Sequence, residues 1–225
     1  MENKTTQKIK KLTAVAVFAA LAYVIHFVHI PVMFLNLDFK DVIMAICGMY
    51  FGPLAGVAVS IIVPLLEYPT SSTGVYGLVM NIISSLTFVG VASVIYKYKK
   101  TLAGAIVSLV AAALSMTAAM MLANLFITPY YMGVERSAVV ALIPKVLLPF
   151  NAVKAILNAS LTLCLYKPLT KVLKATGFGR SGDASIEVKQ GSKTRTVLVL
   201  VIGGVIAVIS LVIIFAVLGG TLAFN

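Results

Sequence analysis

The chain has 225 residues, of which 60% are hydrophobic and 11% are charged, and its mean hydropathy is +1.05. Soluble domains carry about 25% charged residues, so this composition excludes a soluble globular protein and predicts a polytopic membrane protein. The net charge of +11 does not indicate a nucleic-acid-binding protein, because the Lys and Arg residues stand between apolar runs instead of gathering on one face.

The first apolar run, residues 12–30, is long enough to cross a bilayer, which takes about 20 apolar residues. We predict a retained span, because the run lacks a convincing signal-peptide cleavage site. Ala16 and Ala20 form a small-xxx-small pair, which predicts either a docking face for a partner subunit or close packing within the chain. His26 and His29 follow near its far end, but with no third ligand in view we expect no metal site.

Residues 34–39 alternate apolar and polar side chains, so we expect an extended loop with Asn36 and Asp38 on one side. Asp41 comes at the start of the next helix, where a carboxylate caps free N–H groups, and capping is the role we expect for it.

Residues 41–67 form either one kinked helix or two short helices separated at residues 51–53, where Gly52 precedes Pro53. With the N-terminus inside, two helices place Lys97, Lys99 and Lys100 on the inside, as the positive-inside rule requires. We therefore predict two short spans.

The next stretch, residues 67–77, is rich in turn residues and hydroxyl groups and is predicted to be an outside loop able to cover a pocket. Glu67 at its start is either a bond acceptor for a ligand hydroxyl or an interfacial carboxylate. Residues 78–96 and 102–124 are predicted to span inward and outward. We expect Asn124 to end the second of these spans, beside an aromatic girdle.

Residues 137–166 are predicted to return inside, and their apolar sequence is interrupted by Asn151 and Lys154, three residues apart on one helix face. Lys154 is roughly 20 Å of helix from Lys167, so it lies inside the hydrocarbon, where an ionisable group costs at least about 2.5 kcal/mol and normally faces a cavity or a partner. Pro144 and Pro149 predict a kink and a half-helix start near Asn151. A proton-relay role for Lys154 is disfavoured, because no carboxylate is evident at its depth.

Of the 18 Lys and Arg residues, 14 fall in three segments that this topology puts inside, which predicts a cytoplasmic N-terminus. The organisation we expect is a membrane domain over residues 1–175, a basic cytoplasmic linker over residues 176–195 and a further apolar span within residues 196–225.

Four stretches carry a resemblance: LNLDFKD at 35–41, YFGP at 50–53, EYP at 67–69 and PFNAVK at 149–154. Together, and over about residues 8–175, they resemble the substrate-binding S components of energy-coupling factor (ECF) vitamin transporters, most closely the riboflavin-specific members. The resemblance implies an all-α membrane protein of the cell membrane with a six-helix S-component fold. The C-terminal apolar span is an addition to that plan.

The resemblance also implies what the chain binds. It implies capture of riboflavin from outside, as a transported ligand and not a cofactor, and pairing with one transmembrane coupling protein and two ATPases; it implies no enzymatic activity. Ala16 and Ala20 would meet the coupling protein. Asn151, Lys154 and Asn124 would bond the isoalloxazine ring. The loop positions expected to contact or cover the ribityl chain are Asn36, Asp38, Glu67, Tyr68, Thr73, Tyr76 and Leu78.

Three alternatives stay open at this stage. One is an S component for another vitamin, such as thiamine or a pyridoxine-like molecule. Another is a stand-alone proton-coupled carrier in which Lys154 titrates. The third, a membrane enzyme or intramembrane protease, is disfavoured because the spans contain no aspartate pair, no His-Glu-x-x-His and no Gly-x-Ser-x-Gly. The chain also has no P-loop, so ATP would have to be used by another subunit.

Overall fold

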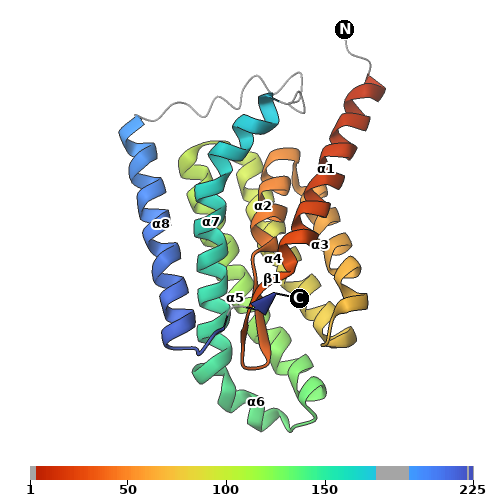
Figure 1. Ribbon diagram of the computed structural model, residues 1–225, viewed down its shortest axis with the longest axis vertical. Coiled ribbons are helices and arrows are strands. Elements are labelled where there is room, and N and C mark those ends of the chain that lie inside the picture. Colours follow the sequence, from red (N-terminus) through yellow and green to blue (C-terminus); the bar gives the residue numbers. More distant parts are fainter. Residues whose placement is uncertain (1–3, 176–192, 222, 225) are drawn as a thin grey trace.

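The computed structural model describes residues 4–175, 193–221 and 223–224, which form a bundle of helices with a small sheet at one end (Figure 1). The helices are α1 (Lys4–His26), α2 (Lys40–Phe51), α3 (Pro53–Glu67), the 3-10 turn η1 (Tyr68–Thr70), α4 (Gly74–Tyr98), α5 (Leu102–Met132), α6 (Arg136–Leu142), the π-helical η2 (Ile143–Leu147), α7 (Leu148–Ala175) and α8 (Lys193–Ala216). The strands are β1 (Val28–Val32), β2 (Leu35–Asp38) and β3 (Ala223–Phe224).

Six helical stretches in the described part of the chain are long and apolar enough to cross a membrane. They are Thr5–His26, Pro53–Thr70, Gly74–Tyr98, Leu102–Met132, Arg136–Tyr166 and Val197–Ala216. The shorter α2 lies within the bundle, with nearly all of its residues buried. The predicted all-α membrane fold is confirmed, and the final apolar run forms a helix as expected. Most of the predicted linker, residues 176–192, lies outside the described residues.

The predicted break between two short helices occurs at Gly52. This residue has φ 101°, a conformation that glycine adopts at little cost, and Pro53 then occupies the first turn of α3, where its missing N–H has no helical partner to lose. On either side of the break, a Cβ added to Gly48 would lie 2.1 Å from Ser93 Oγ and 2.9 Å from the Gly56 Cα. Glycine at these positions therefore lets α2, α3 and α4 approach closely.

The prolines in the predicted span over residues 137–166 interrupt the helix as expected. Pro144 lies in η2, and α7 begins immediately after it at Leu148, with Pro149 in its first turn. Since a proline supplies no N–H and crowds the preceding turn, the helix widens to π geometry there. The interruption places the start of α7 two residues before Phe150 and three before Asn151.

Within the stretch predicted to be extended, residues 35–38 form strand β2 and make a hairpin with the preceding strand, whereas Phe34 lies in the turn and Phe39 leads into α2. Strands β1 and β2 pair antiparallel, with Met33 at φ 53° in the tight turn between them. The strand order is β2-β1-β3, because the chain returns after α8 and adds β3 to the free edge of β1. Figure 1 shows this sheet near the end of the bundle where α5 meets α6.

Candidate ligand-binding site

A cavity opens between the hairpin and helices α4, α5 and α7, with about 880 Å³ of space when its open mouth is included. Its walls mix apolar and aromatic side chains with amides, hydroxyls and charged groups. The lining residues are His26, Phe34, Leu35, Asn36, Asp38, Ser71, Thr73, Tyr76, Gly77, Met80, Asn81, Ser84, Met120, Asn124, Ile127, Thr128, Tyr131, Phe150, Asn151 and Lys154.

Helix α7 contributes Asn151 and Lys154 to the cavity, as their spacing predicted. Both are nearly fully buried, at 2% and 5% exposure. The Asn151 Nδ2 donates to the Leu147 carbonyl oxygen at 2.8 Å, which orients the amide across the widened turn. No group in the described part of the chain bonds the Asn151 amide oxygen, so it is available to a ligand.

Asn124 on α5 lies in the same lining and is fully buried. Its Nδ2 donates to the Met120 carbonyl oxygen at 2.7 Å, and its Oδ1 accepts from the Thr128 hydroxyl at 2.9 Å. The prediction that Asn124 ends its span was wrong, because α5 continues for two more turns to Met132. At 1.5 Å per residue the helix is roughly 46 Å long, which exceeds the roughly 30 Å thickness of a hydrocarbon core, and Ile127, Thr128 and Tyr131 beyond Asn124 also line the cavity.

Lys154 has a carboxylate partner at its own depth, contrary to the expectation from the sequence. Its Nζ lies 3.3 Å from Asp38 Oδ2, and the Lys40 Nζ lies 3.6 Å from the same oxygen. Burial alone would raise the pKa of the Asp38 carboxyl, but the charges of Lys154 and Lys40 beside it lower that pKa to about 2. The Asp38 carboxylate is therefore ionised at neutral pH. Lys154 faces the cavity with part of its charge already compensated.

The cluster continues away from the cavity through Lys40, which is fully buried. Its ammonium group donates to Glu67 Oε2 at the end of α3, and Glu67 Oε1 lies 3.5 Å from the His26 Nδ1. Glu67 is 1% exposed and does not belong to the lining, so the structure gives it an internal partner in place of a ligand hydroxyl.

Asp41 does not cap α2, and this expectation was wrong. The helix begins at Lys40 without a side-chain cap, and Asp41 is buried in its first turn. Its two carboxylate oxygens accept hydrogen bonds from Ser85 at 2.6 Å and from Asn158 at 3.3 Å. Asp41 therefore connects α2 to α4 and α7 beneath the cavity.

This fold occurs in proteins of known class. Residues 10–166 match the model of a family described as "ECF transporter, substrate-specific component". The chain belongs to this family. It is 31% identical over 178 residues to a protein named riboflavin transporter RibU from Staphylococcus aureus (strain TCH60), an alignment that covers 75% of this chain and 94% of that protein. It is 32% identical over 163 residues to riboflavin transporter FmnP from Bacillus subtilis (strain 168), covering 66% of this chain and 86% of the relative.

A solved structure described as the S component of a bacterial ECF transporter has the same fold, with a TM-score of 0.65 and 30% identity. The alignment covers 99% of that chain but only 74% of this one. This S component is therefore longer than its structural neighbour, and α8 lies beyond the part that the family model matches.

The outer loops of this S component supply part of what the sequence predicted. Asn36, Thr73 and Tyr76 belong to the lining. Tyr68 is 41% exposed in η1 and lies outside the lining, as does Leu78 in the first turns of α4. Gly77, next to Leu78 in sequence, occupies the cavity face in its place.

Sequence reasoning missed a face of α4 that this S component turns toward the cavity. Gly77, Met80, Asn81 and Ser84 lie at i, i+3, i+4 and i+7 on that helix, and all four are lining residues. Part of this face was visible in the sequence, because Gly77, Asn81 and Ser84 place small or polar residues on one side of an otherwise apolar helix.

Proposed function

We propose that this S component binds riboflavin in the cavity from outside the cell and delivers it inward together with an ATP-driven energising module. The observation that carries the proposal is the cavity itself, in which the amides of Asn124 and Asn151 and the ammonium of Lys154 converge between apolar walls. The names of the two curated relatives support the choice of riboflavin.

The chemistry of the lining suits this ligand. The isoalloxazine ring is flat and largely apolar but carries carbonyl acceptors and one imide N–H. Asn151 and Asn124 offer amides that accept and donate, and Lys154 offers an N–H donor. Side chains such as Phe150, Met80 and Met120 line the cavity and are suited to the faces of a flat ring.

The polyhydroxyl ribityl chain would extend toward the mouth. Asn36 on β2 and the hydroxyl groups of Ser71 and Thr73 lie in the lining on that side. The Ser71 and Thr73 hydroxyls are 2.8 Å apart and already bond one another, which places them as a pair for a ligand hydroxyl. Tyr76 and Tyr131, whose ring centroids are 6.4 Å apart, would flank the entrance.

The orientation follows from the charges. Lys97 lies in the last turn of α4, at the end farthest from the cavity, and Lys99 and Lys100 follow it. The N-terminal lysines lie in the first turns of α1, on the same side of the bundle. With these groups in the cytoplasm, the cavity opens to the outside. The N-terminus of α1 is then cytoplasmic, and the ligand enters from the medium.

The experiment is titration of the purified protein with riboflavin, followed by quenching of the flavin fluorescence. We expect saturable one-to-one quenching, with thiamine and pyridoxine unable to compete. Saturable binding of thiamine or pyridoxine without riboflavin binding would identify an S component for another vitamin. Riboflavin uptake by the chain alone in liposomes, without ATPases and abolished by a protonophore, would instead indicate a stand-alone carrier.

The face of α1 that carries the small residues Ala16 and Ala20 is the proposed docking site for the transmembrane coupling protein. The coupling protein would in turn connect to two ATPases. Ala14, Phe18 and Ala22 of α1 are buried in the bundle, whereas Ala16 and Ala20 are exposed, so the small pair points away from the core. Helix α8 packs on α7 at the opposite side of the bundle and leaves this face uncovered (Figure 1).

Adding bulk to that face tests the docking. We expect Ala16→Leu/Ala20→Leu to bind riboflavin normally but to lose association with the coupling protein and ATP-driven uptake. Ala118→Leu, on an exposed face of α5, is the matched control and should retain uptake. Normal uptake by the double variant would refute this docking face without affecting the riboflavin proposal.

A further inference from the structure

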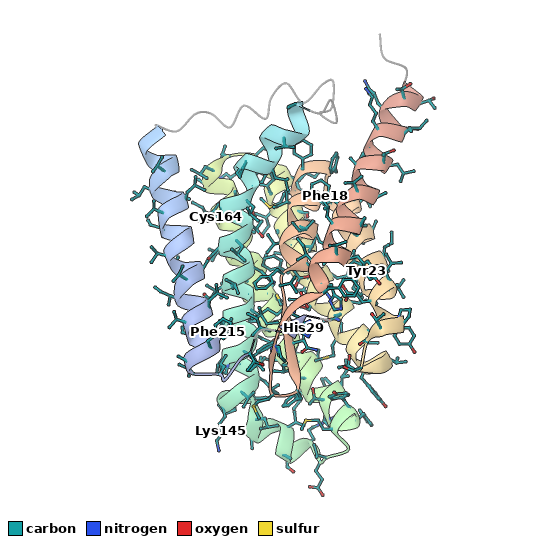
Figure 2. All side chains as sticks on the ribbon, viewed as in Figure 1. Phe18, Tyr23, His29, Lys145, Cys164 and Phe215 are labelled. Carbon is teal, nitrogen blue, oxygen red and sulfur yellow. The ribbon has the colours of Figure 1, made fainter. Side chains whose placement is uncertain are left out.

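The C-terminal part of the chain makes a specific contact with the substrate-site hairpin. Helix α8 packs along α7, where a Cβ added to Gly203 would lie 3.1 Å from the Cys164 Sγ. Figure 2 labels Cys164 on α7 beside α8, and Phe215 near the other end of α8. The helix thus descends along α7 to the end of the bundle that holds the cavity.

After α8 the chain turns back toward β1. Gly219 has φ 68° and permits the turn, and the Gly220 N–H donates to the Ile214 carbonyl oxygen at 3.0 Å. The Thr221 N–H then donates to the Pro31 carbonyl oxygen at 3.3 Å, and β3 pairs with β1 at Val28 and His29. Residues 217–221 and β3 together form the C-terminal return.

Apolar side chains also pack where the hairpin meets α8 and the C-terminal return. Ile30, Val32 and Leu37 of the hairpin are buried in one cluster with Ile214 of α8 and Leu157 of α7. A Cβ added to Gly220 would lie 2.8 Å from both Ile30 and Ile214, so glycine is required for the return to lie against the hairpin.

The hairpin held in this way carries the ligand-facing groups of β2. Asn36 pairs with Pro31, and Asp38 pairs with His29, which itself pairs with Ala223 of the return (Figure 2 shows His29 on the hairpin). A two-stranded hairpin is marginal by itself, and a third strand both stabilises it and covers its free edge. The return therefore acts on the position of Asn36 and Asp38 without entering the cavity.

We propose that the C-terminal return is a positioning element for the ligand site, which holds the β1–β2 hairpin closed over the bound molecule and so slows its release. The segment lies beyond the residues matched by the family model, so it would adjust ligand retention in this chain separately from the shared fold. The identity of the ligand rests on the proposed function; the hold on the hairpin does not.

Two full-length variants are designed to break the contact, and a third variant, on α8, is their matched control. Gly220→Val forces the return away from Ile30, and Thr221→Pro removes the N–H that bonds Pro31. Gly204→Val is the control, because nothing lies within 4 Å of an added Cβ there. Each of the two variants loses about one hydrogen bond or the packing beside it, so we expect the rate of riboflavin release to rise about 3- to 10-fold above that of the parent. The release rate of the Gly204→Val control should stay within about twofold of the parent rate.

A second readout needs no ligand. With Leu37→Cys introduced in each protein, labelling by a water-soluble maleimide reports opening of the hairpin, because Leu37 is fully buried when the hairpin is closed. Labelling should accelerate by the same factor as release, well below the melting temperature of each variant, so that local opening is separated from global unfolding. The parent without Leu37→Cys gives the background from Cys47 and Cys164.

Release and labelling rates equal to those of Gly204→Val in both variants would overturn the proposal. Failure of both variants to fold would also overturn it, because the return would then be needed for the whole bundle. A parent chain that does not bind riboflavin would refute the proposed function alone, since the labelling rates still report the hold on the hairpin.

Discussion

Replacing Lys154 by methionine tests the centre of the proposed site. Methionine keeps most of the length and apolar volume of the lysine but removes the ammonium group, which lies 3.3 Å from Asp38 and faces the cavity. Loss of one hydrogen bond to a buried polar ligand costs about 1–3 kcal/mol, which corresponds to a riboflavin Kd about 5- to 150-fold higher. The Lys40 Nζ stays 3.6 Å from the same Asp38 oxygen, so the carboxylate is not left without a partner and the bundle should still fold.

The assay is fluorescence titration with riboflavin, with Lys145→Met as the control. Lys145 is an exposed lysine in η2, only nine residues before Lys154, and its replacement should change Kd by less than about twofold. The double variant Asp38→Asn/Lys154→Met distinguishes a direct bond from Lys154 to the ligand from neutralisation of the Asp38 charge. If the double variant binds riboflavin as tightly as the parent, Lys154 only neutralises Asp38. Binding by Lys154→Met as tight as that of the parent would refute the assignment of Lys154 to the ligand.

Three further results are expected. Asn151→Ala should raise the riboflavin Kd about 5- to 150-fold in the same titration, and an unchanged Kd would exclude the amide as a ligand contact. Because neighbouring lysines lower the Asp38 pKa to about 2 from an ordinary 3.8, its ion pairs stabilise the fold above about pH 4 and are lost as the pH falls toward 2. The melting temperature of the parent should thus exceed that of Asp38→Asn by a constant amount from about pH 7 to pH 5, and the difference should shrink as the pH falls from about 4 to 2; a difference that stays the same over that range would contradict the pairing. Gly48→Val should destabilise the bundle by about 1–3 kcal/mol through its clash with Ser93, whereas Gly90→Val, with open space around it, should not; equal melting temperatures would argue against the close approach of α2 and α4.

Local features of the site were predictable from the sequence because they depend on neighbours in the chain. Gly52 before Pro53 located the possible break between α2 and α3, although the positive-inside rule was needed to choose two helices, and the prolines predicted a helix start near Asn151, which occurs at Leu148. The alternation in residues 34–39 predicted the extended strand β2. In each case backbone sterics or side-chain periodicity determines the outcome within a few residues.

Contacts between distant segments were not predictable in the same way. Asp38 and Lys154 are 116 residues apart, and Asp41 and Asn158 are 117 apart, so nothing in the periodicity of either segment indicates the pair. Asp41 was assigned a capping role because its position at a helix start suits one. The bundle instead buries it against α4 and α7, and the packing of three helices decides its partner.

The ion cluster explains how a lysine can lie at this depth without a proton-relay role. A lone ammonium there would be costly, but Lys154 shares the Asp38 carboxylate with Lys40, and Lys40 is also bonded to Glu67. These groups come from β2, α2, α3 and α7, so the pairs hold the hairpin and three helices at fixed positions around one end of the cavity. Since the polar groups are already oriented before a ligand enters, the free-energy cost of ordering them on binding is small. The ion pairs hold the hairpin through β2, whereas its other strand, β1, pairs with β3 along its outer edge.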